Sequence, residues 1–168
     1  GAIFVHITGG GLSGWRIDHN HFKDIGQTYQ STRAINVGVY GGMGENIKKD
    51  YPGLIDNNLF TGTNQFKSMQ LYGGCGAYSD WMDTLVLGGS SFIFVEDNII
   101  THTNITDGVS SLDVDSGGRL VFRYNTVTNG WINSHGQEGG DPHYHTSTHA
   151  WEIYNNIKPM SRAPSTAP

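Results

Sequence analysis

The segment "IFVEDNII" (93–100) decides how this chain folds, because four other segments repeat its pattern. An apolar residue, Val95, stands three positions before Asn98, and another, Ile100, stands two positions after it. The equivalent segments are "WRIDHNHF" (15–22), "GLIDNNLF" (53–60), "LVFRYNTV" (120–127) and "WEIYNNI" (151–157), the last with its apolar residue directly after the Asn. The five Asn residues are 38, 40, 27 and 31 positions apart, which indicates a structural repeat with loop insertions of unequal length.

An Asn at the same place in every repeat has two physical explanations. Asn tolerates the left-handed backbone conformation that a sharp bend requires, so we expect it to occupy that position. Its side-chain amide can also bond to the equivalent Asn of the next repeat, because identical side chains form hydrogen-bonded ladders where strands stack in register.

A second strand-like segment precedes each Asn segment. These segments alternate apolar and polar residues with a period of two, so each has one buried face; they are residues 3–7, 34–39, 68–72, 111–115 and 131–135. Each repeat then reads as strand A, a loop, strand B ending at the Asn, a bend and a short strand C. No window shows helical periodicity and the chain contains 24 glycines, so we predict an all-β solenoid in which each repeat covers the next.

These segments, with "SGGRLVFRYNTVTN" (116–129), "SHG" (134–136) and "AWEIYNN" (150–156), resemble right-handed parallel β-helix proteins of the pectate-lyase-like superfamily. The resemblance covers residues 1–158 and extends to secreted bacterial and phage β-helix repeat proteins. It implies about five coils with long loops on one side. Pectate lyases use calcium-binding acids and an arginine base, but no motif assigns those roles to residues of this chain.

The ends of the sequence raise a question of assembly. Residues 159–168 are rich in Pro, Ser, Thr and Ala and read as a linker or tail. No amphipathic segment that could cap a solenoid precedes the first strand. We therefore expect further domains of the same chain, with end-to-end self-assembly as the alternative.

Composition restricts the partners. The net charge of −5 and the lack of a basic patch argue against nucleic acid, and no apolar run is long enough to insert into a membrane. A single cysteine excludes an internal disulfide framework. The low share of charged residues, 15%, together with the resemblance, implies a secreted or cell-surface protein.

The outward residues of strand A should form two rows across the repeats. One row contains Phe4, Asn36, Gln70, Asp113 and Asn133, and the other contains His6, Gly38, Tyr72, Asp115 and His135. Long loops, at 41–53, 73–91 and 136–149, are expected to wall a groove beside them.

Within this groove Asp115 and His135 would lie one coil apart, where a carboxylate can orient a histidine as an acid/base pair. Asp113 is the third catalytic candidate. The alternative for these residues is a solvated polar row with no catalytic role.

Substrate-binding candidates are amide, aromatic and acidic side chains near the same face, since sugar sites combine such groups. They are Tyr72, Gln70, Asn133, Asp80, Trp81 and Asp83. Trp81 could equally pack its loop onto the coil.

The loop "GGDPHYHTSTHAW" (139–151) holds three histidines in seven positions. His143, His145 and His149 are candidate zinc ligands, although no HExxH or paired CxxC pattern accompanies them. A substrate-contacting loop and a structural loop are the alternatives. If a cofactor is needed, we expect a divalent cation, calcium or zinc.

Two functions follow. The first is an extracellular protein that binds or processes a polysaccharide or cell-surface glycan along the strand A groove, as a lyase, a hydrolase or a binding module. The second is a non-catalytic structural or adhesive surface module, such as part of a stalk, fibre or filament.

Overall fold

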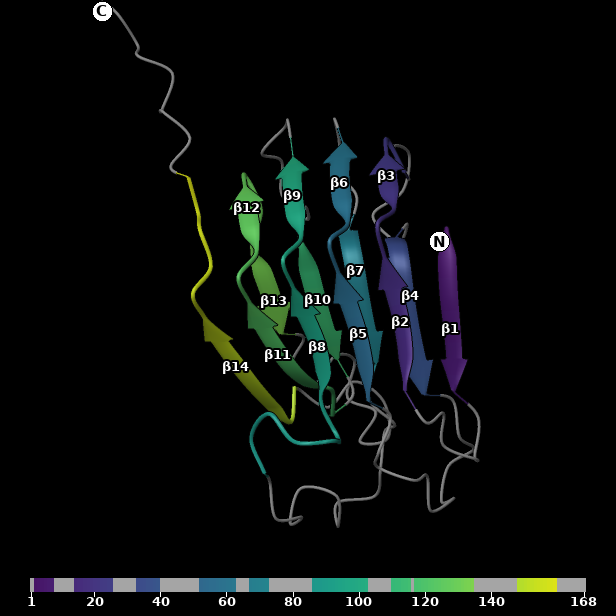
Figure 1. Ribbon diagram of the computed structural model, residues 1–168. Helices are drawn as coiled ribbons and strands as arrows, with labels where there is room; N and C mark the ends of the chain where they lie inside the picture. Colours follow the sequence, from purple (N-terminus) through teal and green to yellow (C-terminus); the bar gives the residue numbers. More distant parts are fainter. Residues whose placement is uncertain are drawn as a thin grey trace, which may run out of the picture.

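The chain forms three parallel β-sheets, and it visits them in the same order again and again (Figure 1). The computed structural model describes residues 2–7, 14–25, 33–39, 52–62, 67–72, 86–102, 110–115, 117–134 and 148–159. Every regular element within these ranges is a strand, which confirms the all-β expectation. Among these residues no helix is long and apolar enough to cross a membrane.

Sheet A contains the first strand of each repeat. Its order is β1 (Ile3–Ile7), β4 (Arg33–Val39), β7 (Lys67–Tyr72), β10 (Leu112–Asp115) and β13 (Ile132–Ser134). Sheet B contains the strands that end two residues before each repeated Asn: β2 (Trp15–Asp18), β5 (Gly53–Asp56), β8 (Ile93–Glu96), β11 (Arg119–Arg123) and β14 (Ala150–Tyr154).

Sheet C contains the short strands after the Asn residues. They are β3 (His21–Lys23), β6 (Leu59–Gly62), β9 (Ile99–His102) and β12 (Thr126–Thr128). In the last repeat the described residues add only an isolated bridge, from Ile157 to Thr126. Ile157 therefore occupies an outward position and is 63% exposed, which explains why this segment departs from the sequence pattern.

In all three sheets sequential neighbours pair in parallel, an arrangement compatible with a parallel β-helix. The inward residues form columns that run through the repeats. One column in sheet B contains Ile17, Ile55, Val95, Phe122 and Ile153, joined through successive strand pairs. Burial of such columns, at about 25 cal/mol per Å² of apolar surface, is the main source of stability for this fold.

The predicted Asn ladder is present and continuous from Asn20 to Asn156. Asn58 shows the pattern: its Nδ2 group lies 2.9 Å from the carbonyl oxygens of Ile17 and Asp56 and 3.1 Å from Asn98 Oδ1. The Asn58 backbone N–H also donates to Asn98 Oδ1, at 3.0 Å. Each interior Asn thus satisfies backbone groups in two repeats at a buried bend, where an unpaired polar group would be costly.

The expectation that the ladder Asn itself adopts the left-handed conformation was wrong. The residue before it does so, with φ between 52° and 58°: His19, Asn57, Asp97, Tyr124 and Asn155. The physical reason is that the ladder side chain must point inward at the bend. The preceding residue therefore adopts the positive φ angle, and its side chain points outward. Four of the five are Asn, Asp or His, which tolerate this region better than most residues; Tyr124 is the exception.

We predict that Asn98→Ala lowers the free energy of unfolding by about 3–4 kcal/mol, because it leaves buried donors and acceptors of two repeats unpaired. Asn20→Ala, at the half-buried start of the ladder, is the matched control and should cost about 1 kcal/mol. Urea unfolding followed by circular dichroism measures both. Equal losses would show that the position within the ladder does not matter.

Candidate functional site

The predicted outward row on sheet A exists with the predicted register. Successive strand pairs place Phe4 beside Asn36, Asn36 beside Gln70, Gln70 beside Asp113 and Asp113 beside Asn133. We call the last four residues of this series the sheet A polar row. The second row is also in register from His6 through Gly38 and Tyr72 to Asp115.

The centre of the sheet A polar row is buried, whereas the solvated row considered for Asp115 and His135 stays an untested alternative. Asp113 is 0% exposed and Gln70 is 2% exposed, while Asn36 and Asn133 are half-buried. The alternation of the strand identified the outward face correctly, but it carries no information on what else covers that face.

Asp113 is held in a buried ion pair. Lys67, at the start of β7, donates to Asp113 Oδ2, and Asn133 Nδ2 lies 3.4 Å from Oδ1. A buried carboxylate with a paired ammonium group is costly to disturb, because removal of one partner leaves an uncompensated charge. This arrangement suits a structural role better than proton transfer to a substrate.

Two amide oxygens in the same row have no partner among the described residues. They are Asn36 Oδ1 and Gln70 Oε1, and both are buried. Asn36 and Gln70 are neighbours in register, so the two unsatisfied acceptors lie on adjacent strands of one face. Unpaired buried acceptors are uncommon, because most buried polar atoms in proteins have a hydrogen-bond partner.

Several other candidates lie outside the described residues. They are His135, Asp80, Trp81, Asp83, His143 and His145. For Tyr72 and Asp115 the structure gives the backbone position within sheet A, where the two are neighbours. The pairing of Asp115 with His135 and the walls of the groove stay predictions.

His149 is the one described member of the histidine set. Its Nδ1 atom accepts a hydrogen bond from Arg119 Nε at 3.3 Å, so this nitrogen is turned toward a cation. Within the described ranges no group of three or more His, Cys, Asp or Glu side chains could hold a metal ion.

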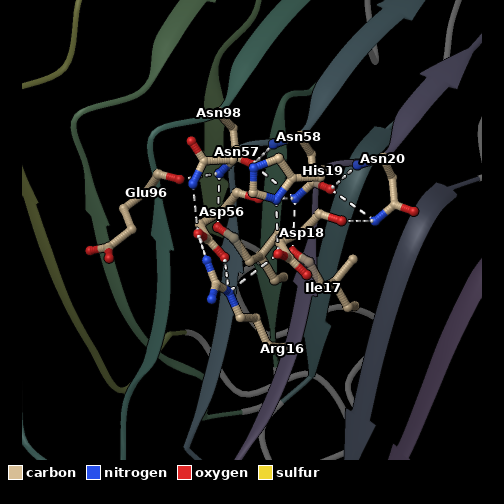
Figure 2. Close-up of polar contacts among 11 residues, drawn as sticks. Arg16, Ile17, Asp18, His19, Asn20, Asp56, Asn57, Asn58, Glu96 and Asn98 are labelled. Atoms are coloured by element: carbon tan, nitrogen blue, oxygen red, sulfur yellow. Dashed lines mark hydrogen bonds and ion pairs between the residues drawn. The ribbon is translucent and has the colours of Figure 1, made fainter.

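A polar row on sheet B was missed by the sequence reasoning, although the repeat locates it two positions before each ladder Asn. It consists of Asp18, Asp56, Glu96, Arg123 and Tyr154, in register. Figure 2 shows its first part, where Arg16 approaches Asp56 with both Nε and Nη2, at 2.8 and 2.6 Å, beside the Asn ladder. The hydrogen bond from Arg16 lowers the pKa of the Asp56 carboxyl.

The second part of this row is built around Arg123. Its Nε lies 2.5 Å from Glu96 Oε2, and its Nη1 donates to the Tyr154 hydroxyl at 2.9 Å. The guanidinium also stands over the rings of Phe94 and Tyr124, at 5.2 and 5.5 Å from their centroids. These contacts cross three repeats, so the row joins neighbouring repeats on the outside as the Asn ladder does at the bend.

A buried histidine, His102, is another group that the sequence reasoning did not single out. It ends β9 with its side chain buried, and its Nε2 atom lies 3.3 Å from the Ser111 hydroxyl. Burial lowers the pKa of His102 to about 4, so the ring is neutral near pH 7.

No protein-family model matches the chain, and neither does a curated protein or a solved structure.

The depressed pKa of His102 predicts a loss of stability in mild acid. Because the folded pKa is below the unfolded value of 6.5, the unfolded state binds more protons as the pH falls from about 6.5 to 4. We expect His102 to account for about 2–3 kcal/mol of lost stability between pH 7 and 4.5.

Urea unfolding at both pH values, with His102→Gln beside the wild type, measures this contribution. The variant should lose about 2–3 kcal/mol less than the wild type over this interval. An equal pH dependence in the two proteins would contradict the assignment.

Proposed function

We propose that this chain is a right-handed parallel β-helix of about five coils, of the pectate-lyase-like type, that serves as a non-catalytic structural or adhesive module. In this proposal residues 1–158 form the solenoid and residues 159–168 a linker, and the protein is secreted or displayed at a cell surface. The parallel pairing of successive repeats in all three sheets supports the solenoid part of the proposal.

The observation that supports a non-catalytic role most directly is the burial of Asp113 and its ion pair. It is the one proposed catalytic side chain whose surroundings are described, and it is fully buried and paired with Lys67. A general acid or base must come within hydrogen-bond reach of the proton that it transfers. Asp113 pairs with Lys67 of β7 instead, so its charge is compensated within sheet A.

The lateral contacts between repeats support a load-bearing or spacing role. Every pair of successive repeats is joined by a ladder Asn, and the sheet B polar row adds ion pairs from Arg16 to Asp56 and from Arg123 to Glu96. Such a body keeps its cross-section along its length, and its loops can vary without a change of register.

The test is release of reducing ends and unsaturated products from a panel of polysaccharides, with and without calcium. We expect no release, because the proposal assigns no acid/base pair. Asp115→Ala and His135→Ala are run beside the wild type. Release that both substitutions abolish would overturn the proposal and establish an enzyme centred on sheet A, whereas release unaffected by them would overturn it and place the centre elsewhere.

A second candidate function, binding of a polysaccharide along sheet A, would use the oxygens of Asn36 and Gln70, which a glycan reaches only by displacing the groups that cover them. Sugar hydroxyls are suitable donors for these acceptors. The acidic balance of the chain makes an anionic polymer a poor ligand unless a divalent cation bridges it.

Gln70→Leu separates this second function from a purely structural row. It removes the unpaired acceptor at similar volume, so we expect almost no change in the free energy of unfolding. If a glycan donates to Gln70, its dissociation constant should rise about fivefold to tenfold, from the loss of about 1 kcal/mol, in affinity electrophoresis or calorimetry. Unchanged glycan binding in this variant would exclude the sheet A polar row as the binding site.

A further inference from the structure

The last repeat exposes apolar side chains that earlier repeats bury. Trp151 and Ile153 of β14 are 44% and 45% exposed. Their neighbours in register on β11, Leu120 and Phe122, are 0% and 1% exposed. The interior columns therefore continue to a last repeat whose apolar side chains the described residues leave partly exposed.

The Asn ladder has a direction, which makes its two ends different. In every step the earlier Asn donates, through its backbone N–H and Nδ2, to Oδ1 of the later Asn; the final step runs from Asn125 to Asn156. Among the described residues nothing accepts from the Asn156 backbone N–H, and nothing donates to Asn20 Oδ1. The last repeat thus presents ladder donors, and the first presents a ladder acceptor.

The outer face of sheet B carries opposite charges in its first and last repeats. Arg16 in the first repeat and Glu152 in the last occupy one row, joined in register through Leu54, Phe94 and Val121. Glu152 is half-buried, and its Oε1 atom lies beside Gly88 without a hydrogen-bond partner among the described residues. Arg16 uses two of its nitrogens on Asp56 and is 52% exposed, so its guanidinium has further donors to offer.

The apolar columns match as well. Trp151 stands in the column that begins with Trp15, and Ile132 stands in the column that begins with Ile3. Ile3 and Trp15 are only partly buried against the core. A first repeat placed on a last repeat would continue both columns with side chains of the same kind.

We propose that a second copy of this chain docks head to tail, with its first repeat on the last repeat of the copy before it. The inference rests on the proposed structural role and names the partner of that role. In the contact, β1 and β2 of one copy extend sheets A and B beyond β13 and β14 of the other, at the usual strand spacing of about 4.8 Å. Asn20 Oδ1 accepts from Asn156, and the backbone of Glu152 lies in register with that of Arg16 of the next copy.

Such a contact uses two different surfaces, so it does not close on itself after one pairing. Repetition of a heterologous contact gives an open-ended assembly. We therefore expect the average mass in solution to rise with protein concentration, without a plateau at the dimer.

The test is analytical ultracentrifugation of the whole chain and of two end variants. Ile153→Lys blocks the last repeat, which presents the ladder donors and is called the donor end. Ile3→Lys blocks the first repeat, which presents the ladder acceptor and is called the acceptor end. Each variant alone should therefore be a monomer. A mixture of the two should form a 1:1 dimer, because it retains one intact pair of surfaces. Ile99→Lys is the matched control, since Ile99 is 51% exposed but lies in β9, between β6 and β12; it should assemble as the wild type does.

Glu152→Lys gives a second variant at the donor end that does not touch the core. It should weaken association at least about tenfold, since it places like charges opposite one another. A wild type that stays monomeric at the highest soluble concentration would overturn the proposal. So would an Ile3→Lys variant that dimerises alone, because that requires contact between two donor ends.

The two proposals fail separately. A monomeric protein without product release would refute head-to-tail docking and leave the non-catalytic role in place. Product release by a protein that still assembles would refute the non-catalytic role, on which the docking proposal rests, while the contact itself would stand.

Discussion

The hydrogen bonds of the repeated Asn residues are the constraint on which the rest of the structure depends. At each bend between sheets B and C the backbone turns inside the protein, where its carbonyl and N–H groups would otherwise be buried without partners. One primary amide supplies donors to two carbonyl groups and an acceptor to the repeat before it, as at Asn58. Because each Asn reaches into the neighbouring repeat, the bends cannot shift relative to one another.

The fixed bends set the register of everything beside them. Strand B ends two residues before each Asn and, in the first four repeats, strand C starts directly after it. The position of the Asn therefore also sets the register of the interior columns and of the sheet B polar row. Arg16 can then meet Asp56 across 40 positions of sequence, and Arg123 can meet Glu96 across 27. These ion pairs are consequences of the register and add to its stability.

The sequence was sufficient to predict this periodic part of the fold. The alternation in strand A placed Gln70 beside Asp113, and the repeated Asn residues predicted the ladder. The left-handed conformation was assigned one position too late. A sequence pattern shows that a bend exists, but not which of two adjacent residues has the positive φ angle. His19 and Asn155 tolerate that conformation as well as their Asn neighbours do.

The environment of the candidate site could not be predicted in the same way. The burial of Asp113 and its pairing with Lys67 join residues 46 positions apart whose sequence neighbourhoods share no motif. The sheet B polar row, in contrast, was available from the aligned repeats. It was overlooked because Asp18, Glu96, Arg123 and Tyr154 differ in chemistry, so the column shows no common residue type.

The unequal number of strands per repeat has a mechanical consequence. In this arrangement the hydrogen bonds between successive repeats run along the stack. Tension in that direction acts on every contact between repeats in turn. The contact with the fewest hydrogen bonds therefore separates first. Within the described residues the last repeat contributes strands to sheets A and B but only the Ile157 bridge to sheet C. Among the described repeats, the one that holds Asn156 would therefore separate before those around Asn58 and Asn98.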